Sequence, residues 1–244
     1  MQHSDTITAP QSDASALGLA VVVGGTGGIG AALVAQLQRD GQYAQVLALS
    51  RRSTPAVDVL DEASIAALAA HITETGQPLR LVIIASGVLQ GPGMQPEKSL
   101  ASLDAAAAAR SFAVNALGPA LLLKHLLPLL PKQGRTVCAA LSARVGSIGD
   151  NHLGGWYAYR ASKAALNQLV HTAAIELRRQ RPQALCVVLH PGTVDTGLSA
   201  PFAKTGLEVR SPQEAAAQLL QVLDGLEPRH SGGFFDWRGE PVPW

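Results

Sequence analysis

A hydrophobic run that passes directly into a glycine-rich turn is the feature that most constrains this fold. Residues 19–23 are all apolar, as in a buried parallel strand, and the turn Gly24-Gly25-Thr26-Gly27-Gly28-Ile29-Gly30 follows at once. A helical pattern then continues to Arg39. Glycine permits a tight turn and close backbone approach, and the N–H groups that open a helix attract phosphate. The order predicts a dinucleotide-binding unit; a glycine turn without a ligand is the alternative.

Strand and helix patterns alternate along the rest of the chain. Further strands are expected at residues 46–49, 56–59, 79–84, 136–141, 184–189 and near Phe234. Helices are expected at 62–75 after an Asp61 N-cap, within 99–130, at 156–179, and from a Ser211–Glu214 capping box to 226. This alternation predicts an α/β fold with a doubly wound parallel sheet of about seven strands flanked by helices. We expect one domain, 19–244, after a loose tail, 1–18.

The end of the second predicted strand bears on the kind of dinucleotide. Such units commonly place an acid about 20 residues beyond the glycines, where it holds the ribose 2′-hydroxyl. Here Ser50, Arg51 and Arg52 occupy that place, and the next acid is Asp58. A guanidinium can bind a 2′-phosphate through two hydrogen bonds, whereas a carboxylate would repel it. We therefore expect NADP(H) in preference to NAD(H); a solvated loop arginine is the alternative.

Small and polar residues follow the later strands as well. Ala85-Ser86-Gly87, Ser142 and Pro191-Gly192-Thr193 each come directly after a predicted strand. In doubly wound sheets, ligands bind beyond the carboxyl ends of the strands. These segments and the glycine turn should therefore meet at one edge of the sheet.

A tyrosine and a lysine four residues apart are the candidate acid/base pair. Tyr159 and Lys163 belong to the predicted helix 156–179, so they share one helix face. Lowering the pKa of a tyrosine by about three units requires about 4 kcal/mol. An ammonium roughly 5 Å away supplies about 3 kcal/mol at an effective dielectric constant of about 20. A half-exposed surface pair is the alternative, and the convergence of motifs at one sheet edge argues against it.

Composition excludes several classes of function. With a formal charge of +1 and few aromatic residues, the chain gives no reason to expect a nucleic-acid partner. Cys138 and Cys186 lie in apolar runs and are expected to be buried free thiols, and no metal-ligand spacing occurs among the histidines. From these cysteines and histidines we expect no metal site. We see neither a signal peptide nor a membrane-spanning run, so we expect no membrane association and a cytoplasmic location.

With these residues in view, the chain resembles the short-chain dehydrogenase/reductase family from about Leu19 to Trp244. The motifs that carry the resemblance are Gly24-x3-Gly28-Ile29-Gly30, Val114-Asn115, Tyr159-x3-Lys163 and Pro191-Gly192-Thr193. The stretches 141–148 and 159–167 are similar to the subgroup named after the bacterial C-factor. The resemblance implies a Rossmann fold, NAD(P)(H)-dependent interconversion of carbonyls and alcohols, and a homodimer or homotetramer built on the long helices.

The resemblance also implies roles for individual residues. Tyr159 would be the general acid/base, and Lys163 would lower its pKa and hold the nicotinamide ribose. Ser142 would orient the substrate carbonyl, and Asn115 would support a water-linked proton path. Asp58 and Val59 would contact the adenine, and Thr193 would meet the nicotinamide carboxamide.

One departure from the family pattern leaves the serine open. The family's catalytic serine commonly lies three residues before the glycine that corresponds to Gly146, and that place is Ala143. Ser142 is one residue earlier, so strict strand alternation would turn its hydroxyl away from the site. Ser147 is the second candidate for the catalytic serine. The displaced serine and the C-factor likeness leave an alternative function: a catalytically weak, nucleotide-binding signalling protein on the same fold.

The cofactor assignment yields a first prediction. Arg51→Glu should weaken NADPH binding far more than NADH binding, because the introduced carboxylate would repel only the 2′-phosphate of NADPH. Titration of each cofactor against the variant, followed by fluorescence, measures both dissociation constants. Equal losses for the two cofactors would remove the assignment of Arg51 to a 2′-phosphate.

Overall fold

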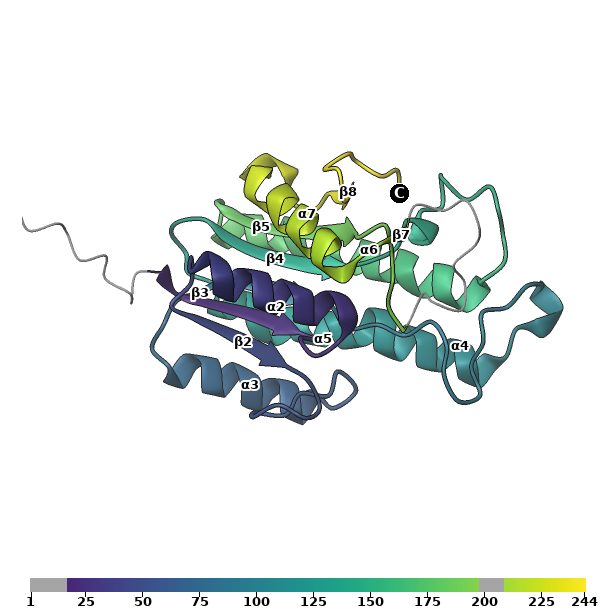
Figure 1. Cartoon of the computed structure of the whole chain (residues 1–244), viewed down its shortest axis with the longest axis horizontal. Helices are drawn as coiled ribbons and strands as arrows, with labels where there is room; N and C mark the ends of the chain where they lie inside the picture. The colour runs from purple at the N-terminus through teal and green to yellow at the C-terminus, as the bar shows by residue number, and fades with distance from the viewer. Residues whose placement is uncertain (1–16, 198–208) are drawn as a thin grey trace, which may run out of the picture.

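Six parallel strands form the central sheet of the structure, a computed structural model that describes residues 17–197 and 209–244 (Figure 1). These strands are β1 (Leu19–Val23), β2 (Gln45–Leu49), β3 (Leu79–Ile84), β4 (Thr136–Leu141), β5 (Ala184–His190) and β8 (Phe234–Asp236). Their order is β2-β1-β3-β4-β5-β8, and each neighbouring pair is parallel. The chain runs from β1 toward one edge and then returns to β3 on the other side of β1. This reversal makes the sheet doubly wound and confirms the predicted fold class.

The prediction of a strand at residues 56–59 is wrong, which is why the described part of the main sheet has six strands rather than about seven. The backbone groups of this segment are used locally instead of in a ladder beside β2. The N–H of Val57 donates to Ser50 O at 2.9 Å, and the N–H of Asp58 donates to Ser64 Oγ at 3.0 Å. The segment therefore forms a folded loop next to the edge strand β2.

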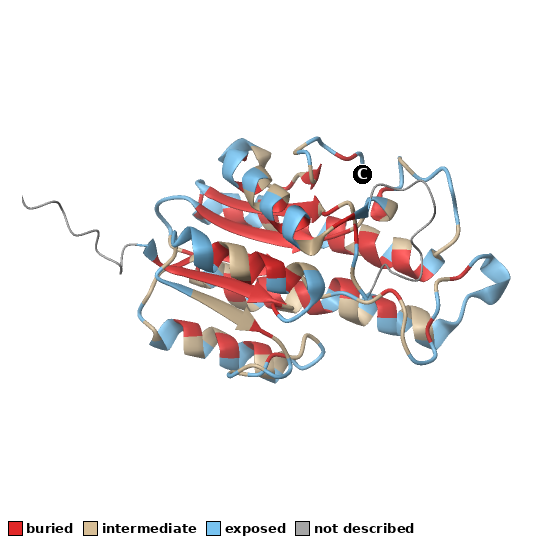
Figure 2. Ribbon diagram, viewed as in Figure 1, coloured by how far each residue is buried: buried red, intermediate tan, exposed pale blue. Residues whose placement is uncertain are grey.

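Helices cover both faces of the sheet (Figures 1 and 2). One core contains side chains from α3 (Glu62–Glu74), α5 (Gly118–Leu126) and α6 (Tyr157–Gln180), and the other contains side chains from α2 (Gly28–Asp40) and α7 (Pro212–Gly225). Side chains alternate along each strand, so β1 contributes Leu19, Val21 and Val23 to the first core and Ala20 and Val22 to the second. The strands of the sheet are mostly buried on both faces, as their continuous apolar sequences predict.

The predicted helical region 99–130 is divided into several short pieces. They are the 3₁₀ turn Leu100–Ser102, α4 (Ala105–Phe112), the π-helical turn Ala113–Leu117, α5 and the 3₁₀ turn Leu127–Leu129. Residues 105–129 are long and apolar enough to cross a membrane by length and composition, but here they pack against α3 and α6. Single π-helical turns are frequent at functional sites, and this one contains Asn115.

The remaining described elements are short. They are the 3₁₀ turns Arg144–Gly146 and Pro228–His230 and the strands β6 (Thr193–Val194) and β7 (Val209–Arg210), which pair with each other in parallel. The predicted tail, 1–18, falls outside the described residues except for Leu17 and Gly18. The predicted caps are present: Asp61 accepts a hydrogen bond from Ala63 N at 3.0 Å, and Ser211 and Glu214 cap each other across the first turn of α7.

Candidate active site

The glycine turn lies between the end of β1 and the start of α2, and it contains the predicted residues Gly24, Gly25, Thr26, Gly28, Ile29 and Gly30. Gly24 has a φ of +83° and donates its N–H to Leu49 O at 2.8 Å. A Cβ on Gly30 would lie 2.1 Å from Gly24 O, so no other residue fits there. Gly27 precedes α2 and has no side chain to cap it. The first turn of α2 thus offers its N–H groups to an anion.

The end of β3 packs directly against this turn. A Cβ on Gly24 would lie 2.9 Å from the Ser86 nitrogen and 2.9 Å from the Ala85 carbonyl carbon. Ser86 Oγ is buried without a hydrogen-bond partner. An unsatisfied hydroxyl beside a glycine cradle fits a polar ligand such as a dinucleotide.

Gly87 connects this edge to the candidate acid/base pair. A Cβ placed on Gly87 would lie 3.4 Å from Asn115 Oδ1 and 3.5 Å from Lys163 Nζ. The predicted residues of β3, of the π-helical turn and of α6 are therefore brought together beyond the carboxyl end of the sheet.

The residues predicted to select the cofactor lie in the loop after β2. The backbone carbonyl of Ser50 accepts hydrogen bonds from Ser53 and Val57, which fold the loop. Arg51 and Arg52 are exposed, and within the described chain no hydrogen bond or ion pair occupies either guanidinium. Both arginines are thus available to an external anion.

Asp58 and Val59 lie between this loop and the helical region that begins at α4. The carboxylate of Asp58 accepts a hydrogen bond from Leu60 N at 3.0 Å. A Cβ on Gly118 would lie 2.8 Å from Val59 Cβ, so Gly118 allows α5 to approach this segment closely. Val59 is therefore packed against the start of α5, and the Asp58 carboxylate caps a local turn.

Asn115 is fully buried and holds three segments together. Its amide nitrogen donates to Val88 O at 2.8 Å, and its amide oxygen accepts from Val88 N at 2.8 Å. The amide nitrogen also lies 3.2 Å from both Ser111 Oγ and Ser162 Oγ. Ser162 Oγ in turn donates to Tyr159 O at 2.9 Å. Asn115 thus links the chain after β3 to the first turns of α6.

Tyr159 and Lys163 are both buried at the start of α6, as one helix face requires. Lys163 Nζ donates to Leu141 O at 2.9 Å and lies 5.9 Å from the centre of the Tyr159 ring. Burial raises the pKa of Tyr159 above its ordinary value and lowers the pKa of Lys163 to about 8. The expectation that Lys163 makes Tyr159 more acidic is therefore not met within the protein. Loss of hydration shifts both pKa values, and the ammonium is directed to a carbonyl oxygen.

The two candidate serines already have partners. Ser142 Oγ donates to Asn167 Oδ1 at 2.7 Å, and Ser147 Oγ accepts a hydrogen bond from Asp150 N at 3.0 Å. Ala143 is extended, with φ −143° and ψ 145°, so its side chain points to the side opposite Ser142. Ser142 thus faces Asn167 of α6, and Ala143 points to the opposite side of the strand, as alternation requires. The role of Ser142 in catalysis stays a prediction.

The segment Pro191-Gly192-Thr193 follows β5 at the same edge. Gly192 has a φ of +80°, and a Cβ there would lie 2.6 Å from an Arg210 guanidinium nitrogen. Arg210 also stacks on Trp237, with its guanidinium carbon 3.3 Å from the ring centre. The sharp turn at Gly192 is therefore packed against Arg210 and Trp237, and β6 begins at the next residue, Thr193.

Ser111, Ser162, Asn167 and Glu97 are polar residues of the site that the sequence-based set omits. Ser111 precedes Asn115 by four residues, and Asn167 follows Lys163 by four, so helical spacing could have placed them on the site face. Ser162 lies inside the stretch Tyr159-Arg160-Ala161-Ser162-Lys163. Glu97, whose carboxylate accepts from Ala158 N at 3.3 Å, has no such signal because it belongs to a distant loop.

Comparison with known proteins bears on this arrangement. The family model described as Enoyl-(Acyl carrier protein) reductase matches residues 24–223. The chain is 42% identical to C-signal of Myxococcus xanthus over 147 residues, 60% of this chain and 84% of that protein. It is 36% identical to 1-hydroxy-2-glutathionyl-2-methyl-3-butene dehydrogenase of Rhodococcus sp. (strain AD45) over 190 residues, 78% of this chain and 79% of that protein.

A solved structure matches nearly the whole chain. The NADPH-bound carbonyl reductase from chicken fatty liver aligns with a TM-score of 0.80 and 26% identity, and the alignment covers 93% of this chain and 98% of that one.

The burial of Lys163 leads to a prediction about stability. Its pKa falls from an ordinary 10.5 to about 8 on folding, so below pH 8 the folded state carries a penalty of about 3 kcal/mol. Lys163→Met removes this penalty but loses one hydrogen bond, worth about 1 kcal/mol. We expect the variant to be about 1–2 kcal/mol more stable at pH 7 by urea unfolding.

The pH dependence of stability provides a second test of the buried ammonium. Between pH 8 and 10.5 Lys163 is more protonated in the unfolded chain than in the folded one, so this residue contributes stability that increases with pH across that range. The Lys163→Met variant should lack this contribution between pH 8 and 10.5, whereas the exposed-site control Lys132→Met should retain it. A variant that is less stable than wild type at pH 7 and keeps this contribution would contradict the assignment.

Proposed function

This chain belongs to the short-chain dehydrogenase/reductase family, and from that premise we propose that it reduces a carbonyl compound to an alcohol with NADPH. It is an NAD(P)-dependent oxidoreductase, similar to C-signal within that family. The observation that carries the proposal is the burial of Tyr159 and Lys163 at the sheet edge where Gly87 and Asn115 meet.

The choice of NADP(H) over NAD(H) is supported by charge. Arg51 and Arg52 are exposed and unpaired within the described chain, and no acid precedes Asp58 in this loop. Together with Ser50 they would hold the 2′-phosphate, the glycine turn would hold the pyrophosphate, and Thr193 would meet the carboxamide. A similar carbonyl reductase has been solved with NADPH bound. When bound, the cofactor supplies the hydride.

In carbonyl reduction Tyr159 would be the proton donor. Its phenol carries its proton at pH 7, because burial raises its pKa further above the ordinary value of 10, and it can donate that proton to the oxygen of a carbonyl that gains negative charge. The pKa of Lys163, about 8, leaves most of its ammonium charged at that pH. Asn115 and Ser162 hold the backbone from which both side chains extend.

Within the proposed catalytic set, the serine hydroxyl is already engaged in a hydrogen bond inside the protein. With its hydrogen donated to Asn167, Ser142 cannot also donate to a carbonyl. The amide nitrogen of Asn167 is buried without a partner, however, so a rotated amide would donate to Ser142 Oγ and release the hydroxyl hydrogen. We propose that Ser142 acts through this rotated arrangement, with Ser147 as the second candidate.

The engaged serines also favour a second candidate function. A protein on this fold that binds the nucleotide but turns over slowly would not need a free hydroxyl beside Tyr159. Ala143, which carries none, is compatible with that alternative.

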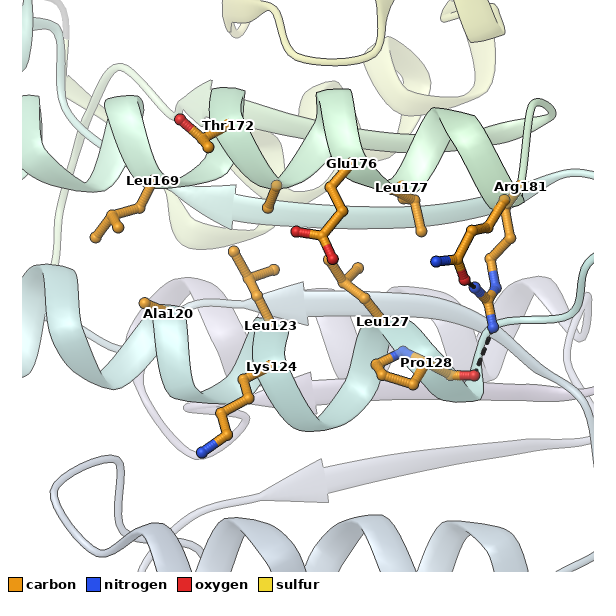
Figure 3. A pocket seen from close by; sticks show the side chains of 12 residues that line it. Ala120, Leu123, Lys124, Leu127, Pro128, Leu169, Thr172, Glu176, Leu177 and Arg181 are labelled. Atoms are coloured by element: carbon orange, nitrogen blue, oxygen red, sulfur yellow. Dashed lines mark hydrogen bonds between the residues drawn. The ribbon is translucent and has the colours of Figure 1, made fainter.

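We further propose that two copies of the chain associate through a groove between α5 and α6. The groove is lined mainly by small and apolar side chains, which include Ala120, Leu123, Leu127, Leu169 and Ala173 (Figure 3). Leu169 is 39% exposed, and its burial against the same surface of a second copy would be favourable. A two-fold contact of this kind is the commonest way in which soluble proteins form dimers.

Tyr159→Phe tests the proposed reaction. The variant keeps the ring and its packing but loses the proton donor, so kcat for NADPH-dependent reduction of a panel of aldehydes and ketones should fall by about 100-fold or more. Loss of NADPH absorbance at 340 nm measures the rate, and NADPH binding should stay within about twofold of wild type. Full activity in the variant would remove Tyr159 from the mechanism.

The same assay separates the serines and the second function. Ser142→Ala should lower kcat by about 10-fold or more, whereas Ser147→Ala should leave it nearly unchanged. The reverse order would transfer the role to Ser147. A wild-type protein that binds NADPH tightly but reduces no member of the panel would favour the nucleotide-binding alternative.

The proposed dimer is tested by a charge in the groove. Ala173→Glu should shift the mass measured by light scattering from that of a dimer, or of a tetramer, toward half that value, because two buried carboxylates would face each other. The control Ile175→Glu lies on the same helix at a residue that does not line the groove. A monomeric wild type, or a variant that keeps the wild-type mass, would contradict the proposal.

A further inference from the structure

The first turn of α6 begins from an unusual backbone conformation. Gly154, Gly155 and Trp156 are consecutive residues with φ of 62°, 66° and 54°. Trp156, the N-cap of α6, is the only non-glycine residue with positive φ among those described. The left-handed conformation is unfavourable for a residue with a Cβ, so it persists only where its surroundings enforce it. Tyr159 lies three residues after this point.

Glu97 contacts the strained start of the helix through both its backbone and its side chain. Its carbonyl oxygen accepts the N–H of Trp156 at 2.5 Å, and its carboxylate accepts the N–H of Ala158 at 3.3 Å. A Cβ on Gly155 would lie 3.4 Å from the same carbonyl oxygen, so the two chains are in close contact. The ring of Trp156 then meets the ring of Tyr159 edge-on, with 6.2 Å between their centres.

The carboxylate of Glu97 is placed where a helix attracts negative charge. Glu97 is only 6% exposed, and no cation in the described chain pairs with its carboxylate. The first N–H groups of α6 carry a partial positive charge and lack partners within the helix, so they compensate the buried carboxylate. A buried acid that is satisfied by the helix start is therefore also a restraint on that start.

The loop that precedes α6 is held on its outer side by Arg160. The guanidinium donates to Gly155 O at 2.9 Å, Gly154 O at 3.0 Å and Val145 O at 3.2 Å. These bonds hold the left-handed residues but do not reach the N–H of Ala158. Glu97 is the side chain that does.

Glu97 belongs to a segment, residues 88–97, that we call the strap. The strap is fixed at its other end by Asn115, which makes two hydrogen bonds to Val88. It projects past the carboxyl end of the sheet beside the loop that leads into α6 (Figure 1). The strap thus runs from one predicted catalytic residue to the helix turn that carries another.

We propose that Glu97 is a positioning residue for Tyr159. Its carboxylate fixes the first turn of α6 through Ala158 N–H and so sets the place of the phenol at the site. The inference rests on the proposed carbonyl reduction, because it assigns Glu97 a role in that reaction.

Three substitutions of Glu97 test the proposal. Glu97→Ala removes the acceptor, and Glu97→Asp keeps the charge but is shorter by one methylene, so both should lower kcat by about 10- to 100-fold at saturating NADPH and carbonyl. Glu97→Gln keeps an oxygen at the same reach and should stay within about threefold of wild type. NADPH dissociation constants should be unchanged in all three, which a general loss of structure would not allow.

A matched control separates positioning from stability. Glu214 also caps the start of a helix, α7, far from Tyr159 in the sequence. Glu214→Ala should lower the Tm but leave kcat unchanged. Activity in Glu97→Ala and Glu97→Asp within threefold of wild type, or an equal loss in Glu97→Gln, would overturn the proposal. Where Glu97→Ala fails to fold, the comparison of Asp with Gln decides.

Hydrogen exchange distinguishes this failure from failure of the proposed function. The amide of Ala158 should exchange faster in Glu97→Ala and Glu97→Asp but not in Glu97→Gln, whatever the reaction is. A wild type without carbonyl reductase activity would refute the function, while unchanged exchange at Ala158 would refute the restraint.

Discussion

The ammonium of Lys163, held away from water at the end of β4, is the interaction on which the arrangement of the site depends. Its residue is 3% exposed, and the ammonium donates to the carbonyl oxygen of Leu141, the last residue of that strand. The last residue at the carboxyl end of a strand can have a carbonyl group that is not used in the ladder. The oxygen of Leu141 can therefore accept a hydrogen bond from the ammonium. The bond ties α6 to the sheet at the level of Tyr159. It also places a charge where hydration is weak and the electric field of that charge is strong.

Around this charge the site is assembled from buried polar side chains that satisfy one another. Asn115, Ser111 and Ser162 form a cluster that joins two helical segments, and Ser142 pairs with Asn167. Buried polar networks of this kind specify one arrangement of the helices because a shift leaves donors and acceptors unpaired. The resulting rigidity suits a reaction in which a proton and a hydride must reach adjacent atoms.

Much of the fold follows from patterns that the sequence displays openly. The strands β1, β3 and β4 have the predicted bounds because each is a mainly apolar run, interrupted only by Arg80 in β3 and begun by Thr136 in β4, and almost all of their residues are buried. The segment 56–59 has similar composition, but the hydrogen bonds of Val57 and Asp58 with Ser50 and Ser64 hold it in a loop. Composition alone does not report such competition from side-chain hydroxyls.

The site was predictable as a set of positions but not as a set of environments. Spacing brings Tyr159 and Lys163 to one helix face, yet spacing says nothing of burial, which reverses the expected shift in the pKa of Tyr159. Glu97 lies 61 residues before Ala158, and only the folded chain places its carboxylate there. Strand alternation predicts only that Ser142 and Ala143 point to opposite sides, and the structure adds that Ser142 faces Asn167 of α6.

The π-helical turn Ala113–Leu117 has a consequence for the whole rod of residues 105–129. A turn with one residue more than the α-helical number rotates everything beyond it by about 100° relative to a regular helix. Ser111, before this turn, and Leu123 and Leu127, after it, therefore lie on the same side of the rod, toward α6, where the two leucines line the groove between α5 and α6. A single wide turn thus keeps one continuous length of chain against α6, with the buried polar cluster at one end and the groove at the other.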